Sequence, residues 1–129
     1  MGYPTLADTF LKVRDMDRAV EFYEAFLGVE AEYRYRDRWT SITGRLGLYN
    51  PSYDRRHGVP MTEYDRELRV GNNVIAVFSS DDLDADHSRV QSLGASEVTP
   101  ILEINLVTPY RFFHFKDPDG NILEVGAMG

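Results

Sequence analysis

The side chains best placed to do chemistry lie near the carboxyl end, in the stretch RFFHFKDPDGNILEV (residues 111–125). The DPDG sequence at its centre has the residue types of a tight turn, because its proline fixes φ and its glycine accepts a positive φ. If residues 118–120 form the loop, counting outward predicts that His114 lies opposite Glu124 on two antiparallel strands. Opposed side chains on such strands have Cβ atoms about 4.5–5.5 Å apart, so the imidazole and the carboxylate are expected to touch.

Alternation of side chains divides this predicted hairpin into two unlike faces. One face is wholly apolar and is expected to pack against helices; it carries Phe113, Phe115, Leu123 and Val125. The other face mixes aromatic and ionisable groups; it carries Phe112, His114, Lys116, Ile122 and Glu124. Ionisable groups are costly to bury without partners, so the mixed face is predicted to line a cleft.

An imidazole that faces a carboxylate can act as an acid and base pair without a metal ion. His114 and Glu124 are therefore the candidate catalytic residues. The same two side chains also fit a purely structural cross-strand pair, which is worth a fraction of a kcal/mol. The sequence leaves both interpretations open.

The elements that must position these residues follow one pattern twice. In the first half, alternation from Thr5 to Val13 predicts a strand. Asp15 then stands at the N-cap of an amphipathic helix that Gly28 ends. Three short strands are expected next, at residues 30–35, 39–43 and 45–49.

The second half repeats this order after a polar segment. Residues 73–79 read as a strand, Asp82 repeats the N-cap, and a helical stripe runs to Gly94. Strands are expected near residues 97–102, at 110–116 and at 121–125. An internal duplication of a strand-helix-strand-strand-strand unit explains the repeat. His87, on the second helical stripe, is expected to be a half-buried helix histidine.

Residues 50–69 separate the two halves and read as a long polar loop, because Pro51, Gly58 and Pro60 occur among charges. Loops of that length are often lids or binding loops. Tyr53, Met61 and Tyr64 are the side chains that would fold over a ligand, whereas His57 is expected to be solvated.

Composition narrows the classes of function. The 129 residues fit one domain and contain no cysteine, which excludes disulfides, thiolate metal ligands and a cysteine nucleophile. No long apolar run and no apolar leader occur, so a soluble protein in the cytoplasm is expected, without membrane association. The formal net charge of -7 argues against nucleic acid as a partner.

Three arginines recur at strand spacing, at positions 34, 36 and 38. This spacing predicts three guanidinium groups on one side of a strand. A solvated outer face is the plain interpretation, and a local patch for an anion or a partner is the alternative.

The runs VRDMDRAVEFYEAFLG (residues 13–28) and FHFKDPDGNILEV (residues 113–125) resemble the vicinal oxygen chelate superfamily. That superfamily includes glyoxalases, bleomycin-resistance proteins, fosfomycin-resistance enzymes and ring-cleaving dioxygenases. The resemblance spans nearly the whole chain and implies an α+β fold of two βαβββ modules, with curled mixed sheets around a shared cleft, commonly in a homodimer. We therefore expect one domain over residues 1–129, with module one at about 1–50, the loop at 51–70 and module two at about 71–129.

Metal-dependent members of that superfamily place ligands on the first strand of each module and on the last strand. By resemblance these positions fall on Asp8, near Ile75 and on Glu124. Isoleucine cannot coordinate a metal, and a catalytic site generally needs three protein ligands. Asp8 and Glu124 are thus the candidate ligands of a divalent ion, and His114 would be a third only if the metal lay off the usual site. An incomplete metal site is expected.

The predicted function is that of a glyoxalase or bleomycin-resistance type of protein, which binds or transforms a small organic molecule in a cleft lined by His114 and Glu124. A divalent-metal-dependent lyase, isomerase or transferase is the alternative that the resemblance implies. A third possibility is a binding module without catalysis, whose aromatic wall would hold a flat or hydrophobic compound. The residues expected to contact the ligand are Asp8, Phe10, Trp39, Tyr49 and Phe112. The same aromatic residues also fit a hydrophobic core.

Overall fold

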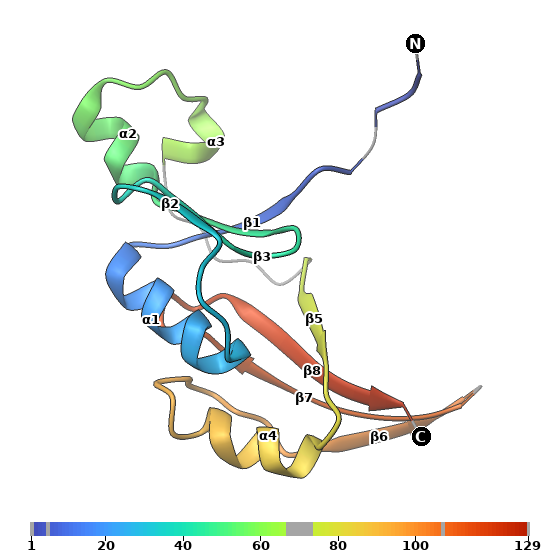
Figure 1. Ribbon diagram of the computed structural model, residues 1–129. Coiled ribbons are helices and arrows are strands. Elements are labelled where there is room, and N and C mark those ends of the chain that lie inside the picture. The colour runs from blue at the N-terminus through green and yellow to red at the C-terminus, as the bar shows by residue number, and fades with distance from the viewer. Residues whose placement is uncertain (1, 5, 67–73, 107, 129) are drawn as a thin grey trace. The chain divides into compact units, whose positions relative to one another are not determined.

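The computed structural model describes residues 2–4, 6–66, 74–106 and 108–128 of the chain (Figure 1). The chain divides into two compact units, residues 1–69 and residues 70–129. Each unit has its own four-stranded mixed sheet and its own covering helix.

The first unit runs strand, helix and three strands, followed by two short helices. Its elements are β1 (Thr9–Lys12), α1 (Met16–Leu27), β2 (Tyr33–Tyr35), β3 (Trp39–Thr43), β4 (Leu46–Tyr49), α2 (Pro51–His57) and α3 (Glu63–Arg66). The strand order in the sheet is β1-β4-β3-β2, with β1 parallel to β4 and the other pairs antiparallel. Among the described residues, regular pairing of the first strand begins at Thr9, later than predicted, and Thr5, where the predicted strand began, lies outside them.

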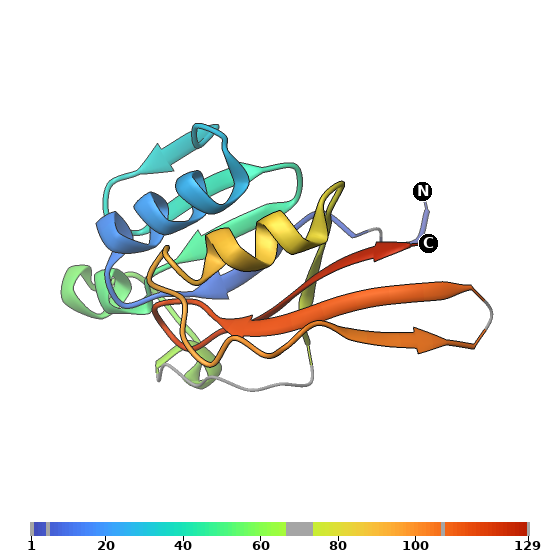
Figure 2. The same cartoon turned by 90° about the horizontal axis from the view of Figure 1, so that it is seen from below.

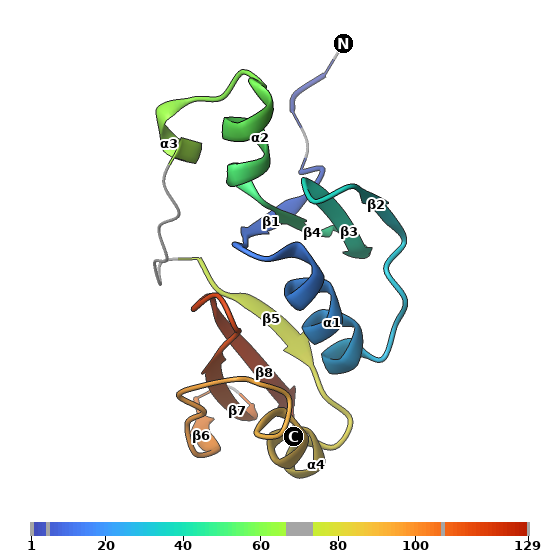
Figure 3. The same ribbon diagram turned by 90° about the vertical axis from the view of Figure 1, so that its left-hand side faces the viewer.

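Helix α1 begins and ends where the sequence predicts. The Asp15 carboxylate accepts a hydrogen bond from the Arg18 backbone N–H at 3.1 Å, and Gly28 takes a φ of 65° that closes the last turn. The helix lies against β3 and β4, as Figure 3 shows. The buried side chains of the helix are Met16, Ala19, Phe22, Tyr23 and Phe26. The face of the sheet opposite α1 is therefore the one that remains for other contacts.

The prediction of a long polar loop at residues 50–69 is wrong in part, because the segment contains α2 and α3. Asn50 caps α2 by accepting a hydrogen bond from the Ser52 N–H at 3.1 Å, and Pro51 takes the first helical position. Gly58 ends the helix with a φ of 66°. Proline at the first position and glycine just past the end are favoured in helices. The sequence interpretation treated the same two residues as breakers.

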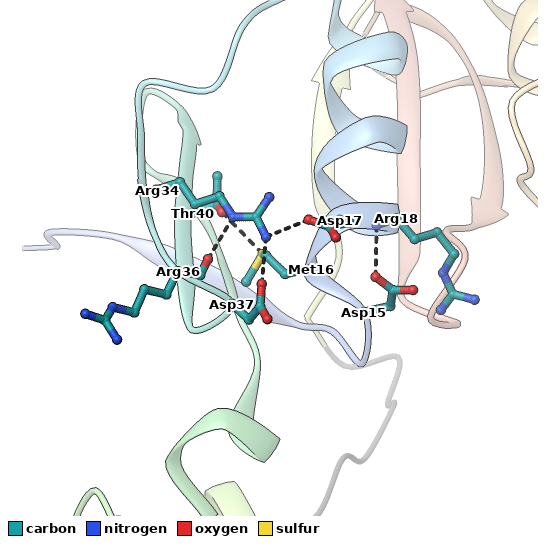
Figure 4. Close-up of polar contacts among 8 residues, drawn as sticks. All are labelled: Asp15, Met16, Asp17, Arg18, Arg34, Arg36, Asp37 and Thr40. Atoms are coloured by element: carbon teal, nitrogen blue, oxygen red, sulfur yellow. Dashed lines mark hydrogen bonds and ion pairs between the residues drawn. The ribbon is translucent and has the colours of Figure 1, made fainter. Parts of the chain in front are cut away.

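The three arginines do not line one side of a strand, so that prediction is also wrong. Arg34 lies on β2 and bonds the carboxylates of Asp17 and Asp37 at 2.7 and 2.9 Å (Figure 4). Arg36 lies in the turn after β2 with a φ of 49°, which ends the alternation. Arg38 points to a buried carboxylate, described below.

The second unit repeats the order of the first. Its elements are β5 (Ala76–Ser79), α4 (Leu83–Val90), β6 (Leu102–Asn105), β7 (Pro109–Lys116) and β8 (Ile122–Met128). The strand order is β5-β8-β7-β6, with β5 parallel to β8. The chain is therefore an α+β protein of two βαβββ modules, as predicted.

Helix α4 covers one face of β7 and β8, as Figure 2 shows. Asp82 caps it by accepting from the Ala85 N–H at 3.1 Å, as predicted, but the regular helix ends at Val90, before Gly94. His87 is half-buried in this interface, donates to the Thr99 carbonyl at 2.8 Å and contacts the ring of Phe113 edge-on. It is therefore a structural histidine, as expected.

The strand predicted near residues 97–102 lies further along the chain, as β6. Glu97 takes a φ of 52°, which interrupts an extended run, and Pro100 has no N–H to donate. Isolated contacts, not a continuous ladder, join this part of the chain to β7: Ser96 and Lys116 exchange backbone hydrogen bonds at 3.0 and 2.8 Å, and the Thr99 N–H donates to the His114 carbonyl at 2.9 Å.

The β7–β8 hairpin has the predicted register. His114 pairs with Glu124, and between this pair and the turn Phe115 pairs with Leu123 and Lys116 with Ile122. The Asp117 carboxylate fixes the turn by accepting from the Asp119 and Asn121 backbone N–H groups at 2.9 and 2.8 Å. The apolar face is buried as predicted, with 0–2% exposure at Phe113, Phe115, Leu123 and Val125.

No helix within the described part of the chain is long and apolar enough to cross a membrane.

Candidate functional site

The candidate site lies on the face of the second sheet that is opposite α4, which we call the Glu124 face. Its members alternate with the buried residues along each strand; around Glu124 they are Val77, Leu102, Ile104, Tyr110, Phe112, His114, Glu124 and Gly126, and Lys116 and Ile122 lie on the same face nearer the turn. Around Glu124 the face thus combines apolar side chains with one imidazole, one phenol and one carboxylate.

Three aromatic rings form a row along β7. Tyr110 stacks on Phe112 with ring centroids 5.6 Å apart and an interplanar angle of 15°. Phe112 in turn contacts the His114 ring at 5.3 Å and 49°. Residues two apart on a strand share a face, so the extended backbone of β7 produces the row directly.

Glu124 on β8 receives hydrogen bonds from both ends of this row. The Nε2 atom of His114 lies 2.8 Å from Oε1 of Glu124. The hydroxyl of Tyr110 donates to Oε2 at 2.6 Å. Each carboxylate oxygen therefore has its own protein donor.

Gly126 allows Tyr110 to reach Glu124. Tyr110 is paired with Met128, two positions beyond Gly126, so its side chain must lean back across β8 to meet the carboxylate. A Cβ on Gly126 would overlap the hydroxyl and Cζ of Tyr110. The missing side chain thus makes a niche that the phenol group of Tyr110 occupies.

The hydrogen bonds define which atoms are available to a ligand. An ionised carboxylate only accepts hydrogen bonds, so His114 carries a proton on Nε2, and in the neutral imidazole Nδ1 is an acceptor. Nδ1 has no hydrogen-bond partner among the residues that the structure describes. The His114 side chain is 34% exposed and that of Glu124 is 19% exposed. The imidazole is the more accessible group, and the carboxylate supports it from behind.

Tyr110 remains a donor across the neutral range. Burial raises the pKa of Tyr110 to about 12, and the hydrogen bond to Glu124 and the charge of that carboxylate act in the same direction. Each cause disfavours the phenolate.

Tyr110 and Gly126 are the residues that the sequence interpretation missed. It placed the end of the last strand at Val125 and so left Gly126 outside the hairpin. The available signal was the i, i+2, i+4 spacing of Tyr110, Phe112 and His114, together with a glycine two residues after the candidate carboxylate.

The donors around Glu124 do not fit the metal centre that the resemblance implies. The residue beside Glu124 on β5 is Val77, and Ile75, the predicted position, lies just before that strand; neither can coordinate a metal. No group of three His, Asp or Glu side chains that could hold a metal occurs in residues 2–4, 6–66, 74–106 and 108–128. One carboxylate and one imidazole fall short of the three ligands of a catalytic centre.

Asp8 belongs to the first unit, where it is exposed just before β1. Its predicted roles as a metal ligand and as a ligand contact stay predictions.

Three predicted ligand contacts of the first unit do lie together, on the face opposite α1. The ring of Phe10 contacts Trp39 at 5.7 Å and Tyr49 at 5.5 Å, edge-on in both cases. Phe10 is 44% exposed, whereas Tyr49 is only 6% exposed. The ring of Trp39 lies over Gly47, where a Cβ would overlap it. Phe10 and Trp39 thus keep accessible surface, whereas Tyr49 is a core residue.

Tyr49 is fixed by hydrogen bonding to the buried carboxylate of Asp54, which also binds the partly exposed Arg38. The Tyr49 hydroxyl donates to Oδ2 of Asp54 at 2.6 Å, and the Arg38 guanidinium bonds both carboxylate oxygens at 2.6 and 3.1 Å. Burial and the hydrogen bond to Asp54 raise the pKa of Tyr49. Burial alone would raise the pKa of Asp54, but the hydrogen bonds from Arg38 and Tyr49 outweigh it and lower that pKa.

The residues predicted to fold over a ligand from the α2–α3 segment have different positions. Tyr53 is buried at 7% exposure and stacks on the ring of His57 at 3.9 Å. Tyr64 is 88% exposed, and its backbone carbonyl accepts from Lys12 at 2.7 Å. Tyr53 therefore anchors α2, and of these two tyrosines only Tyr64 has a free side-chain surface.

The chain is similar over most of its length to proteins of one superfamily. Residues 5–125 match the sequence profile of the Glyoxalase/Bleomycin resistance protein/Dioxygenase superfamily. An uncharacterized protein of Bacillus subtilis (strain 168), YwbC, is 28% identical over 124 residues, which cover 90% of this chain and 91% of that protein.

Solved structures agree with this similarity. A protein of unknown function from Agrobacterium tumefaciens str. C58 has a TM-score of 0.74 at 20% identity, covering 98% of this chain and 96% of the other. A glyoxalase/bleomycin resistance protein/dioxygenase family enzyme from Burkholderia phytofirmans PsJN has a TM-score of 0.73 at 14% identity, covering 95% and 98%. At these identities the likeness concerns the fold alone.

Proposed function

Because the chain belongs to the Glyoxalase/Bleomycin resistance protein/Dioxygenase superfamily, we propose that it binds or transforms a small organic molecule on the Glu124 face, with His114 and Glu124 as its acid and base pair. The observation that carries the proposal is the carboxylate of Glu124, which is bonded at one oxygen by His114 and at the other by Tyr110. A carboxylate held in this way supports an imidazole and is not presented to a metal ion.

His114 is the group that would meet the ligand. Its Nδ1 atom can accept a hydrogen bond or a proton, and the Nε2–H bond to Glu124 stabilises the imidazolium that a proton transfer produces. The same proton can return to another atom of the substrate, which is the chemistry of an isomerase or of a lyase. The pair therefore suits a substrate with a weakly acidic C–H or O–H group.

The rest of the Glu124 face suits the apolar part of such a molecule. Val77, Leu102 and Ile104 are 59%, 50% and 46% exposed, and the ring of Phe112 is half-buried beside His114. Apolar walls with a few polar groups are typical of small-molecule sites. The same surface supports a second candidate function, a binding protein without turnover, in which Nδ1 only accepts a hydrogen bond.

The metal-dependent lyase, isomerase or transferase is the alternative that family membership suggests. The donors beside Glu124 do not fit it, because Val77 stands where a further ligand would be needed. No step through a metal is therefore part of the proposal.

We further propose that the protein is a homodimer. Strands β2 and β6 are edges of their sheets and their residues are exposed. Edge strands in general offer backbone groups for pairing with another chain. A second copy of the chain can cover such edges.

A thermal-shift screen of small organic compounds in the presence of EDTA tests the binding site. Compounds that bind should raise the Tm of the wild-type protein without an added ion. The His114→Ala and Glu124→Gln variants should lose this shift. Arg111→Ala is the matched control, because Arg111 lies on the opposite face of β7 and bonds the exposed Asp84; it should keep the shift.

Two results would contradict the proposal. Shifts that appear only after a divalent ion is added would favour the metal-dependent alternative. Shifts that persist undiminished in His114→Ala would place the ligand elsewhere.

A further inference from the structure

We propose that Tyr110 is a positioning residue, which acts through Glu124 to hold His114 in one tautomer and so to present Nδ1 to the ligand. The inference concerns how the site is organised, and its functional meaning rests on the function proposed above. Tyr110 itself need not touch the substrate.

The first step is the geometry of the carboxylate. A carboxylate with a single donor can rotate about its last torsion and exchange that donor between its two oxygens. Glu124 has two donors from the protein, at 2.6 and 2.8 Å, approaching different oxygens from the same strand. With the Tyr110 hydroxyl bonded to Oε2, only Oε1 is left for the imidazole, and the orientation of the carboxylate is fixed.

The second step is the selection of the tautomer. A fixed acceptor at Oε1 favours the proton on Nε2 of His114, since the other tautomer would place a lone pair against an ionised oxygen. The ring nitrogen that remains, Nδ1, is then an acceptor. His114 can act as a general base, or as an acceptor that orients a ligand, through Nδ1 only when that nitrogen carries no proton.

The third step is how the fold keeps Tyr110 in place. The phenol ring is stacked on Phe112 and lies in the niche made by Gly126. An equivalent arrangement occurs in the first unit, where Trp39 lies over Gly47 and its Nε1–H donates to the Ser41 hydroxyl at 2.9 Å. The two units therefore share the niche, but among the residues that the structure describes the ring reaches an ionisable group only in the second unit. This difference indicates that the contact from Tyr110 to Glu124 is not a by-product of sheet packing.

The test uses imidazole nitrogen spectra of the ligand-free, full-length protein, with the three histidines labelled with ¹⁵N. At about pH 9 an ordinary imidazole is neutral, and two-bond couplings from the ring carbon protons show which nitrogen carries the proton. The wild-type protein should show His114 in the Nε2–H form alone.

Two variants remove the contact by different routes. Tyr110→Phe keeps the ring and its stacking but removes the hydroxyl, and Gly126→Ala displaces the ring from its niche. Both should bring the Nδ1–H form of His114 into the spectrum as a second population. Gly47→Ala, which displaces Trp39 in the first unit instead, is the matched control and should leave the His114 signal unchanged.

A merely structural role for Tyr110 predicts something else. In that case Tyr110→Phe would lower the Tm but leave His114 in one tautomer, and this outcome would overturn the proposal. The spectra are recorded without ligand, so they are independent of the compound screen. If no compound binds the wild-type protein, the proposed function fails while the tautomer result still decides the role of Tyr110.

Discussion

The pairing of His114 with Glu124 could be predicted by counting outward from the DPDG turn, because a hairpin loop of known length fixes which residues oppose each other. The third member, Tyr110, could not be predicted in the same way. Its contact to Glu124 is diagonal, since Tyr110 is paired with Met128, four residues beyond Glu124 on β8, and it depends on a glycine at position 126. Register predicts direct neighbours, whereas diagonal contacts also depend on which side chains are absent.

Asp54 gives a pH dependence at the scale of one residue. Its hydrogen bonds from Arg38 and Tyr49 lower its pKa, so its ionised form is favoured in the folded state. The stabilisation is fully present above the unfolded pKa of about 4 and is lost as the pH falls through the lower folded value. Urea unfolding at stepwise lower pH should therefore show a steeper loss of stability in the wild-type protein than in Asp54→Asn. Parallel curves for the two proteins would contradict this role.

At the scale of elements, α1 and the apolar face of the β7–β8 hairpin could be predicted from the sequence. In both, the spacing of the apolar residues and the residues that end the element (caps in α1, the turn in the hairpin) indicate the same structure. Helix α2 could not be predicted in this way. Its seven residues, PSYDRRH, form no apolar stripe, and the helix is held by the carboxylate of Asp54 against Arg38 and Tyr49. An ion pair between a buried carboxylate and an arginine 16 residues away leaves no periodic signal in the sequence.

The attachment of α2 can be tested with a matched pair of variants. Asp54→Asn removes one side of an ion pair in which the carboxylate is 1% exposed and the arginine is 36% exposed. We expect a loss of about 2 kcal/mol, below the roughly 3–5 kcal/mol of a fully buried pair, because the guanidinium is partly solvated. Hydrogen exchange should become faster in α2 and stay unchanged in α1.

The control for this experiment is Asp37→Asn, which removes an exposed partner of Arg34. It should change the free energy of unfolding by less than about 1 kcal/mol. Equal losses in the two variants would show that Asp54 does not hold α2.

At the scale of the whole chain, the duplication seen in the sequence extends to details that the sequence did not show. Both units have the same strand order and the same parallel pairing of first and last strands. Both also carry an aromatic ring over a glycine in the last strand, Trp39 over Gly47 and Tyr110 over Gly126. The niche occurs twice because the pairing register between the third and fourth strands is the same in the two units. The periodicity of a single strand does not reveal such a register.

The proposed homodimer makes a prediction at this scale. Light scattering coupled to gel filtration should give a mass of about twice the 14.8 kDa of the chain. A single species at the mass of one chain, over a range of concentrations, would contradict the dimer. A monomeric protein would leave the proposed site on the Glu124 face unaffected.

The central claim is that the imidazole of His114, supported by Glu124, meets a small organic ligand without the help of a metal ion. The most direct measurement is a titration of a compound from the screen into ¹⁵N-histidine-labelled protein in EDTA. We expect the Nδ1 resonance of His114 to shift in proportion to occupancy, while those of His57 and His87 stay in place. A bound compound that leaves Nδ1 of His114 unperturbed would contradict the claim.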